Sequence, residues 1–163
     1  MKDQLIEYTK YNLWANTMLV GFIKQIEPTL LDKKLTSSFE TIRLTLLHIW
    51  DAELIWKKRI EGKSLTDWPS KSFKGSDEEM FKEFLACSES WIELVQNKTE
   101  EQLNSMFEYS SMEGKQYSNK LWESVHHCMN HSTFHRGQLV TMLRCVGFTE
   151  LTSTDYITYI REA

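Results

Sequence analysis

The 163-residue sequence contains few residues that can crosslink a chain or form tight turns, with only 3 Cys, 2 Pro and 6 Gly. The cysteines, Cys87, Cys128 and Cys145, are odd in number and widely spaced, which argues against a disulfide framework and against a cysteine-based zinc knuckle. The shortage of glycine and proline indicates few tight turns. Because the thiols show no sign of pairing, we expect a reducing, cytoplasmic location.

The sequence also lacks the patterns of several functional classes. It has no stretch of about 18 uninterrupted apolar residues, and its N-terminal MKDQLIEYTK is too polar for a secretory segment, so we expect no membrane association. The formal net charge is −4 and both signs are interspersed, which disfavours nucleic acid as a partner. A nucleophile elbow, a Walker loop and a glycine-rich dinucleotide fingerprint are all missing.

The sequence is rich in helical periodicity. Apolar residues recur every three or four positions in four segments, which run from Tyr11 to Ile26, from Leu44 to about Gly62, from Phe81 to Val95 and from Leu121 to Val146. A chain of this length, with 41% hydrophobic residues, can bury one self-sufficient core. We therefore predict one all-α domain over residues 1–163, built as a four-helix bundle.

The segments between these helices have turn residues and no helical period. We expect a loop over residues 63–76, with Ser76 as the N-cap of the third helix. Between residues 102 and 118, alternation around Glu113-Gly114 predicts a short hairpin. The bundle should thus have a longer crossover between its third and fourth helices, and a short helix should follow near the C-terminus.

The five histidines are confined to two of the predicted helices, at positions 48, 126, 127, 131 and 135. At about 100° per residue, His131 and His135 lie about 40° apart and about 6 Å along the axis, so both can reach one ion. His135 falls inside the apolar sector and His131 at its margin. His127 lies about 40° beyond that margin and His126 points away. The inward pair of this helix is therefore His131 and His135.

A third ligand has to come from another helix, and His48 is the histidine that remains. It is flanked on its own face by Leu44, Ala52 and Ile55, in the position that a bundle gives to an interior ligand. A core histidine bound to backbone is the competing interpretation, which the two other histidines disfavour. The H-x-x-x-H spacing alone also occurs in helices without metal. We predict a divalent metal site formed by His48, His131 and His135.

Three neutral imidazoles leave coordination positions open for water or substrate, as in catalytic zinc sites. Zinc, nickel, iron and manganese ions all fit such a ligand set. Asp51, about one turn from His48, and Arg136 are candidates for second-shell contacts, with an exposed carboxylate and a solvated arginine as the alternatives. Cys128 is expected to be an inert buried thiol; as a fourth ligand it would close the site.

Four stretches resemble the DinB/YfiT-like family of bacterial metalloenzymes. They are YNLWAN (11–16), TIRLTLLHIWDAELIWKKRIEG (41–62), NHSTFHRGQL (130–139) and MLRCVGFTELTSTDYITYI (142–160). The second stretch is similar to the block with the family's first metal-binding histidine, which matches His48. The third is similar to its most specific motif, whose two ligand histidines match His131 and His135. The order and wide separation of these stretches argue against chance agreement.

This resemblance implies a bundle, often a homodimer, with a three-histidine site for nickel, zinc or a similar ion. Members with assigned activity are similar to thiol-dependent S-transferases or isomerases that use bacillithiol or mycothiol. The leading hypothesis is therefore a metal-dependent transferase that joins a low-molecular-weight thiol to an electrophilic small-molecule substrate. Two alternatives stay open: a metal-dependent hydrolase, and a non-catalytic metal-binding or stress-response module whose ion ties the second and fourth helices together.

Overall fold

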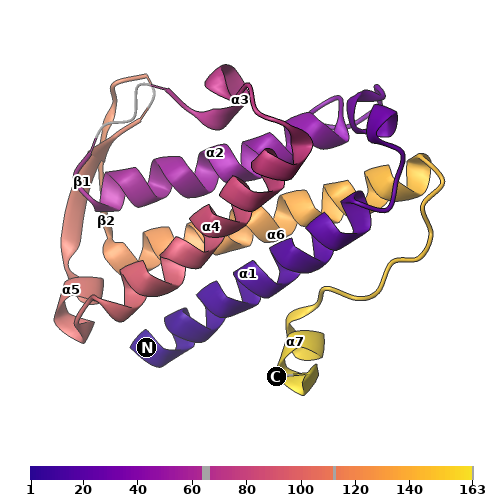
Figure 1. The fold of residues 1–163 in the computed structure, drawn as a ribbon. Coiled ribbons are helices and arrows are strands. Elements are labelled where there is room, and N and C mark those ends of the chain that lie inside the picture. Colours follow the sequence, from indigo (N-terminus) through magenta and orange to yellow (C-terminus); the bar gives the residue numbers. More distant parts are fainter. Residues whose placement is uncertain (64–66, 112, 163) are drawn as a thin grey trace.

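Four long helices make up the bundle in the computed structural model, which describes residues 1–163 except 64–66, 112 and 163 (Figure 1). They are α1 (Lys2–Ile23), α2 (Ile42–Ile60), α4 (Asp77–Gln96) and α6 (Leu121–Cys145). Each predicted periodic segment forms a helix, and the prediction of an all-α four-helix bundle is confirmed. Among the described helices, none has the combination of length and apolarity that crossing a membrane requires.

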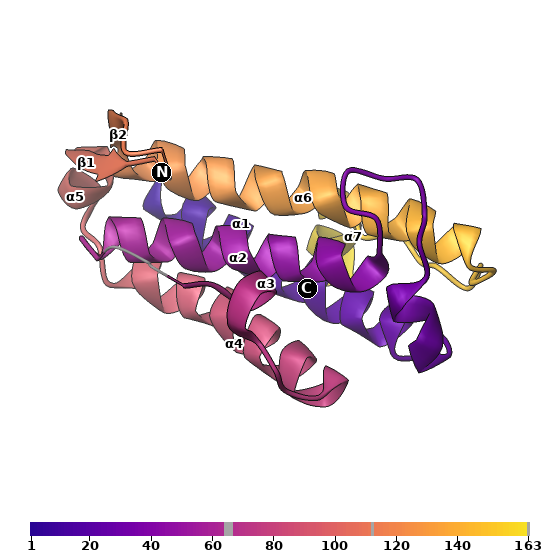
Figure 2. The same cartoon turned by 90° about the horizontal axis from the view of Figure 1, so that it is seen from above.

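The order of the helices around the bundle differs from their order in the chain. Helix α1 contacts α4, α4 contacts α2, α2 contacts α6, and α6 contacts α1. Consecutive helices α1 and α2 therefore lie diagonally across the bundle. Figures 1 and 2 show α2 and α4 running in one direction and α1 and α6 in the other. The two helices that carry the histidines, α2 and α6, are thus antiparallel neighbours.

The predicted hairpin lies in the long connection between α4 and α6. Strands β1 (Met106–Ser110) and β2 (Gln116–Lys120) pair in antiparallel register, with Tyr109 opposite Tyr117. Gly114 in the turn has a φ of 80°, a conformation that glycine adopts without steric cost. This connection is the longer crossover that the sequence predicted.

Short helical elements occur in the other connections. They are the 3-10 helix η1 (Pro28–Asp32), α3 (Pro69–Ser72), α5 (Glu100–Asn104) and the C-terminal α7 (Tyr156–Glu162). Helix α7 confirms the predicted terminal helix. Helices α3 and α5 were not predicted, because one turn of helix is too short to show a period. Within the predicted loop 63–76, residues 64–66 lie outside the described part of the chain.

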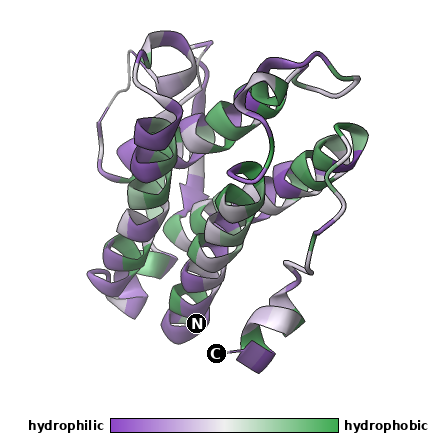
Figure 3. Cartoon of the chain, turned by 45° about the vertical axis from the view of Figure 1, so that its right-hand side comes forward, coloured by the Kyte–Doolittle hydropathy of each residue, from purple (hydrophilic) through white to green (hydrophobic). Residues whose placement is uncertain are grey.

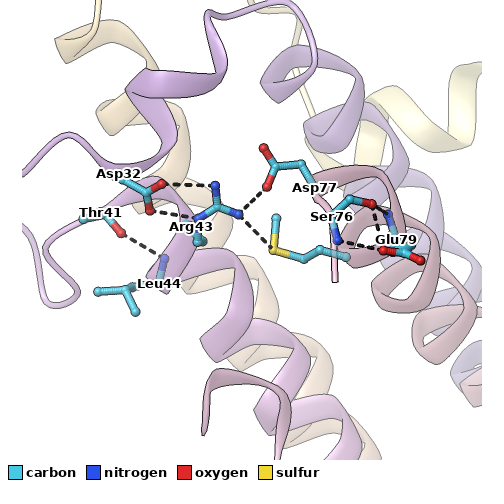
Figure 4. A network of polar contacts seen from close by, with 8 residues as sticks. Asp32, Thr41, Arg43, Leu44, Ser76, Asp77 and Glu79 are labelled. Atoms are coloured by element: carbon cyan, nitrogen blue, oxygen red, sulfur yellow. Dashed lines mark hydrogen bonds and ion pairs between the residues drawn. The ribbon is translucent and has the colours of Figure 1, made fainter. Parts of the chain in front are cut away.

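Polar contacts fasten the start of α4 and the segment before α2 to the bundle (Figure 4). Arg43 donates from Nε and Nη2 to the carboxylate of Asp32, at 2.8 and 3.1 Å, and from Nη1 to Asp77. Ser76 Oγ accepts from the Glu79 backbone N–H while the Ser76 N–H donates to the Glu79 carboxylate, which completes a capping box. The predicted N-cap at Ser76 is confirmed.

A polar layer separates the two larger of the three buried apolar clusters, the third of which consists of Tyr11, Ala15 and Tyr159. One cluster includes Leu19, Leu46, Phe84 and Leu139, and the other includes Leu5, Trp91, Val125 and Met129. Between them, every long helix contributes buried polar side chains, and together these form the polar layer: Asn12, Asn16, Glu53, Ser88, Ser132 and Arg136. Figure 3 shows hydrophilic and hydrophobic residues interspersed along each of the long helices.

Glu53 is the centre of the polar layer and is completely buried. Its carboxylate accepts hydrogen bonds from four side chains: Ser88 Oγ (2.6 Å), Asn12 Nδ2 (2.7 Å), Asn16 Nδ2 (3.0 Å) and Ser132 Oγ (3.1 Å). The buried guanidinium of Arg136 donates to the side-chain oxygens of both asparagines. Burial raises the pKa of the Glu53 carboxyl group, which its four hydrogen bonds oppose. The buried carboxyl group and the buried guanidinium are joined through two amides, and all four long helices are tied at one level.

The buried face of α2 corrects one prediction. The periodicity placed Leu44 on the inward face, but its side chain is 41% exposed. The buried face is instead formed by Ile42, Leu46, Ile49, Trp50 and Glu53. Apolar residues surround the start of this helix, so the period alone could not select one side. His48 is half-buried, at the border of this face.

Candidate metal centre

His48 of α2 meets His131 and His135 of α6 at the interface of the two helices. One ligand nitrogen from each ring lies within 4.8 Å of the other two. The Nε2 atoms of His48 and His131 are 3.2 Å apart, and the His135 ring centroid lies 4.5 Å from that of His48 and 4.4 Å from that of His131. The structure therefore brings together the three side chains that the sequence predicted as ligands.

The separation of these nitrogens suits a shared ion. With metal–nitrogen distances of about 2.0–2.1 Å and tetrahedral angles, two ligand nitrogens lie about 3.3 Å apart. The His48–His131 distance of 3.2 Å matches this value. Within the described part of the chain, no cysteine or carboxylate joins the group. The three histidines could hold a divalent metal ion and leave part of its coordination open.

The orientation of His135 is set by an amide one turn further along α6. Its Nδ1 lies 2.8 Å from Gln138 Oε1, and Gln138 Nε2 donates to Ser38 Oγ at 3.0 Å. With the amide oxygen as acceptor, Nδ1 carries the proton, and the lone pair of Nε2 is available to an ion. The sequence alone did not predict this role of Gln138. Its proximity to His135 was the signal that could have found it.

Phe39, from the segment between η1 and α2, covers one side of the triad. Its ring stacks on His48 with centroids 4.0 Å apart and lies 5.7 Å from His135. Phe134, beside His135, is 64% exposed at the outer edge of the site. Phe39 shields the His48 ring from water, while Phe134 offers apolar surface to an incoming molecule. Neither contact was predicted, because the segment that carries Phe39 has no period.

The triad favours neutral imidazoles, which is the form that binds metal. Burial lowers the pKa of His48 to about 4, and the neighbouring His135 adds to the effect. Burial likewise lowers the pKa of His131 to about 4, with further contributions from the other histidines. The pKa of His135 is lowered by burial, against the opposing effect of Gln138. An ion would therefore not have to displace protons at neutral pH.

The second ring nitrogen of His131 lacks the support that His135 receives. His131 Nδ1 is buried and has no hydrogen-bond partner among the described residues. An unpaired buried nitrogen costs free energy, so packing and the neighbouring rings hold this side chain in place.

Asp51 and Arg136 lie near the ligands in sequence, but their described hydrogen bonds go to residues other than the three histidines. Asp51 Oδ1 accepts from the backbone N–H of Ser70 at 2.9 Å and so anchors α3 to α2. Arg136 is 2% exposed and belongs to the polar layer, where its guanidinium donates hydrogen bonds to Asn12 and Asn16 of α1. It is therefore neither solvated nor bonded to the triad. Both alternatives, the exposed carboxylate and the solvated arginine, are therefore wrong.

The remaining candidates stand apart from the triad. His127 is exposed, with its ring 6.1 Å from His131 and 4.9 Å from Trp56. His126 is exposed and lies beside Tyr8. Cys128 is buried in an apolar cluster, and burial raises the pKa of its thiol, as expected for an inert side chain.

Comparison with known proteins agrees with this architecture. Protein DinB of Bacillus subtilis (strain 168) is 29% identical over 167 residues, which cover 98% of this chain and 95% of that protein. The crystal structure of a DinB-like protein from Bacillus subtilis has a TM-score of 0.66 at 17% identity, covering 91% of this chain and 97% of that chain.

A second solved structure, YfiT from Bacillus subtilis, has a TM-score of 0.70 at 14% identity, covering 91% of each chain. YfiT is described as a probable metal-dependent hydrolase with an unusual four-helix bundle topology. At these identities the solved structures establish a shared fold. The model of the DinB family matches residues 1–163. Because this match spans the whole sequence, the chain belongs to the DinB family.

Proposed function

We propose that the protein is a metal-dependent thiol S-transferase that acts on small electrophilic molecules. The observation that carries the proposal is the group of three neutral imidazoles, whose ligand atoms lie within 4.8 Å of one another. Three uncharged ligands leave a divalent ion its full charge and open coordination positions. The resemblance to thiol-dependent members of the family supports a thiol as one reactant.

A divalent ion in this place would supply positive charge that favours the thiolate form of a low-molecular-weight thiol. The thiol proton leaves to solvent, a sulfur–carbon bond forms, and the leaving group departs with the electrons of the bond that breaks. In this reaction Gln138 orients His135, and Phe39 excludes water from one side of His48.

The test is to incubate the metal-loaded protein with cysteine, glutathione, coenzyme A or bacillithiol together with monochlorobimane. Conjugate fluorescence should rise faster than in the His131→Ala variant, and only when a thiol is present. His127→Ala is the matched control, because it removes an exposed histidine from the same helix and should keep the rate. If no thiol gives a rate above that of His131→Ala, the transferase assignment is wrong.

A hydrolase is the second candidate, favoured by the shared fold with YfiT and its description as a probable metal-dependent hydrolase. An ion held by the same triad would then activate water instead of a thiol. Turnover of ester or amide substrates without added thiol would identify a hydrolase. Strict dependence on thiol would exclude one.

A further inference from the structure

A cavity of about 530 Å³ lies between the C-terminal end of α2 and the hairpin, in a region that the histidine triad does not use. Ile55, Arg59 and Lys63 line it from α2 and the residues just after it, and Trp68 and Tyr109 contribute aromatic walls. None of the three candidate ligands is among the lining residues. The cavity is therefore separate from the triad.

The lining of the cavity carries two positive charges, from Arg59 and Lys63, and one negative charge, from Glu108; among the described residues Arg59 forms no ion pair. Its guanidinium carbon lies 4.8 Å from the ring centre of Trp56 and 5.2 Å from that of Tyr109. Lys63 pairs with Glu61 at 3.1 Å, whereas Arg59 makes no ion pair or side-chain hydrogen bond with any residue that the structure describes. Burial lowers the pKa of Arg59, which reflects the desolvation of an uncompensated charge. An anion in the cavity would compensate it.

The cavity continues the face of α2 that carries His48. Arg59 follows His48 by about three helical turns, which places it about 16 Å along the axis and about 20° around it. Ile55, which lines the cavity, lies about 10 Å along the axis from His48 on the same face. Across the interface, the His127 ring lies between the two regions, 6.1 Å from the His131 ring and 4.9 Å from the ring of Trp56, which packs against Arg59 and Tyr109 of the cavity lining. One extended molecule could therefore reach both places.

We propose that this cavity is an anion subsite, in which Arg59 binds the carboxylate or phosphate end of an elongated substrate whose reactive end lies at the triad. A guanidinium stacked on aromatic rings presents its N–H donors in a fixed plane, which suits either anion. Ser110 Oγ, in the same lining, accepts from Gln116 and keeps its own hydroxyl proton for donation. The position of the reactive end rests on the proposed function; anion binding by Arg59 does not.

Anion binding is tested by titrating the purified protein with succinate and, separately, with inorganic phosphate, using tryptophan fluorescence and calorimetry. At least one of the two anions should bind saturably, and the separate titrations show whether it is the carboxylate or the phosphate. Arg59→Gln should weaken binding about tenfold or more, as expected for a lost charged hydrogen-bond donor. Arg59→Lys keeps the charge without the planar fork and should bind with intermediate affinity. Lys33→Gln removes an exposed charge outside the cavity and should bind like wild type.

The main competing explanation is that the anion binds directly to a metal ion at the triad. His131→Ala should therefore retain anion affinity while it loses metal. Two results would overturn the subsite: no saturable binding of either anion, or binding that survives in Arg59→Gln and disappears in His131→Ala.

A kinetic comparison separates the subsite from the proposed function. Glutathione should have a lower KM than its diethyl ester in the bimane reaction of the wild-type protein, and this difference should vanish in Arg59→Gln. Equal KM values for acid and ester, without anion binding, would reject the subsite and leave the transferase assignment intact. Anion binding through Arg59 without turnover of any thiol would reject the transferase assignment and leave the subsite intact.

Discussion

Gln138 is the residue on which the orientation of His135 depends, because its amide oxygen accepts from the Nδ1 side of that ring. Replacing Gln138 by Ala removes this support without touching a ligand. We expect metal affinity to fall about 10- to 100-fold, the usual effect of losing an outer-shell partner. Competition with a chromophoric chelator measures the change, with His127→Ala as a control that keeps its affinity. Unchanged affinity in Gln138→Ala would show that packing alone orients the ring.

The low pKa of His48 and of His131, about 4 in each case, predicts acid sensitivity of the metal-free protein. An unfolded histidine titrates near pH 6.5, so the unfolded chain binds more protons than the folded chain between about pH 6.5 and pH 4. The free energy of unfolding should therefore fall as the pH decreases through this window. Urea denaturation at several pH values tests this. A His48→Gln, His131→Gln double variant should lose less stability over the same range, and an equal loss would assign the effect to other groups.

At the scale of elements, the polar layer sets the register of α2 against α6. Glu53 of α2 accepts from Ser132 of α6, which is the residue next to His131. Glu53→Ala would leave Arg136 buried without its counterion, so we expect the free energy of unfolding to fall by about 3–5 kcal/mol. Ser88→Ala removes one hydrogen bond to the same carboxylate and should cost about 1–2 kcal/mol. Chemical denaturation compares the two variants, and equal losses would mean that the charge pair contributes nothing of its own.

The apolar repeats predicted where the helices lie, but not every face that they bury. The start of α2 has apolar residues on several sides, and Leu44 was therefore assigned to the wrong face. Glu53 was overlooked because a carboxylate is normally exposed. Its burial depends on partners from α1, α4 and α6, and spacing along one helix cannot reveal them.

The triad could be predicted because it depends mostly on local geometry. Two of its members are spaced by one helical turn, and His48 was the histidine that remained on another helix. The contacts of Phe39 and Gln138 instead depend on the path of the irregular segment before α2. The cavity at Arg59 depends on where the hairpin packs. These features follow from tertiary structure, which the periodicity of single segments does not determine.

For the whole molecule, the response to metal removal separates a catalytic ion from a structural one. The bundle has three apolar clusters and a polar layer that do not involve the triad. Ligand linkage of about 3 kcal/mol in a domain of this size corresponds to a decrease in Tm of about 6–12 °C. We expect chelation to lower the Tm by about this amount while the helical circular dichroism persists at 25 °C. Global unfolding on chelation would instead favour the non-catalytic module, in which the ion holds the helices together.

The sequence separation of 83 positions from His48 to His131 also determines when the site can exist during biosynthesis. The first imidazole leaves the ribosome long before the other two, and they meet only when α6 has emerged and docked against α2. A nascent chain offers at most isolated histidines, which hold a divalent ion weakly compared with three converging rings. Under the proposed function, the finished fold rather than the growing polypeptide would take up the ion, and the pool of free metal around the folded protein would decide which element is bound.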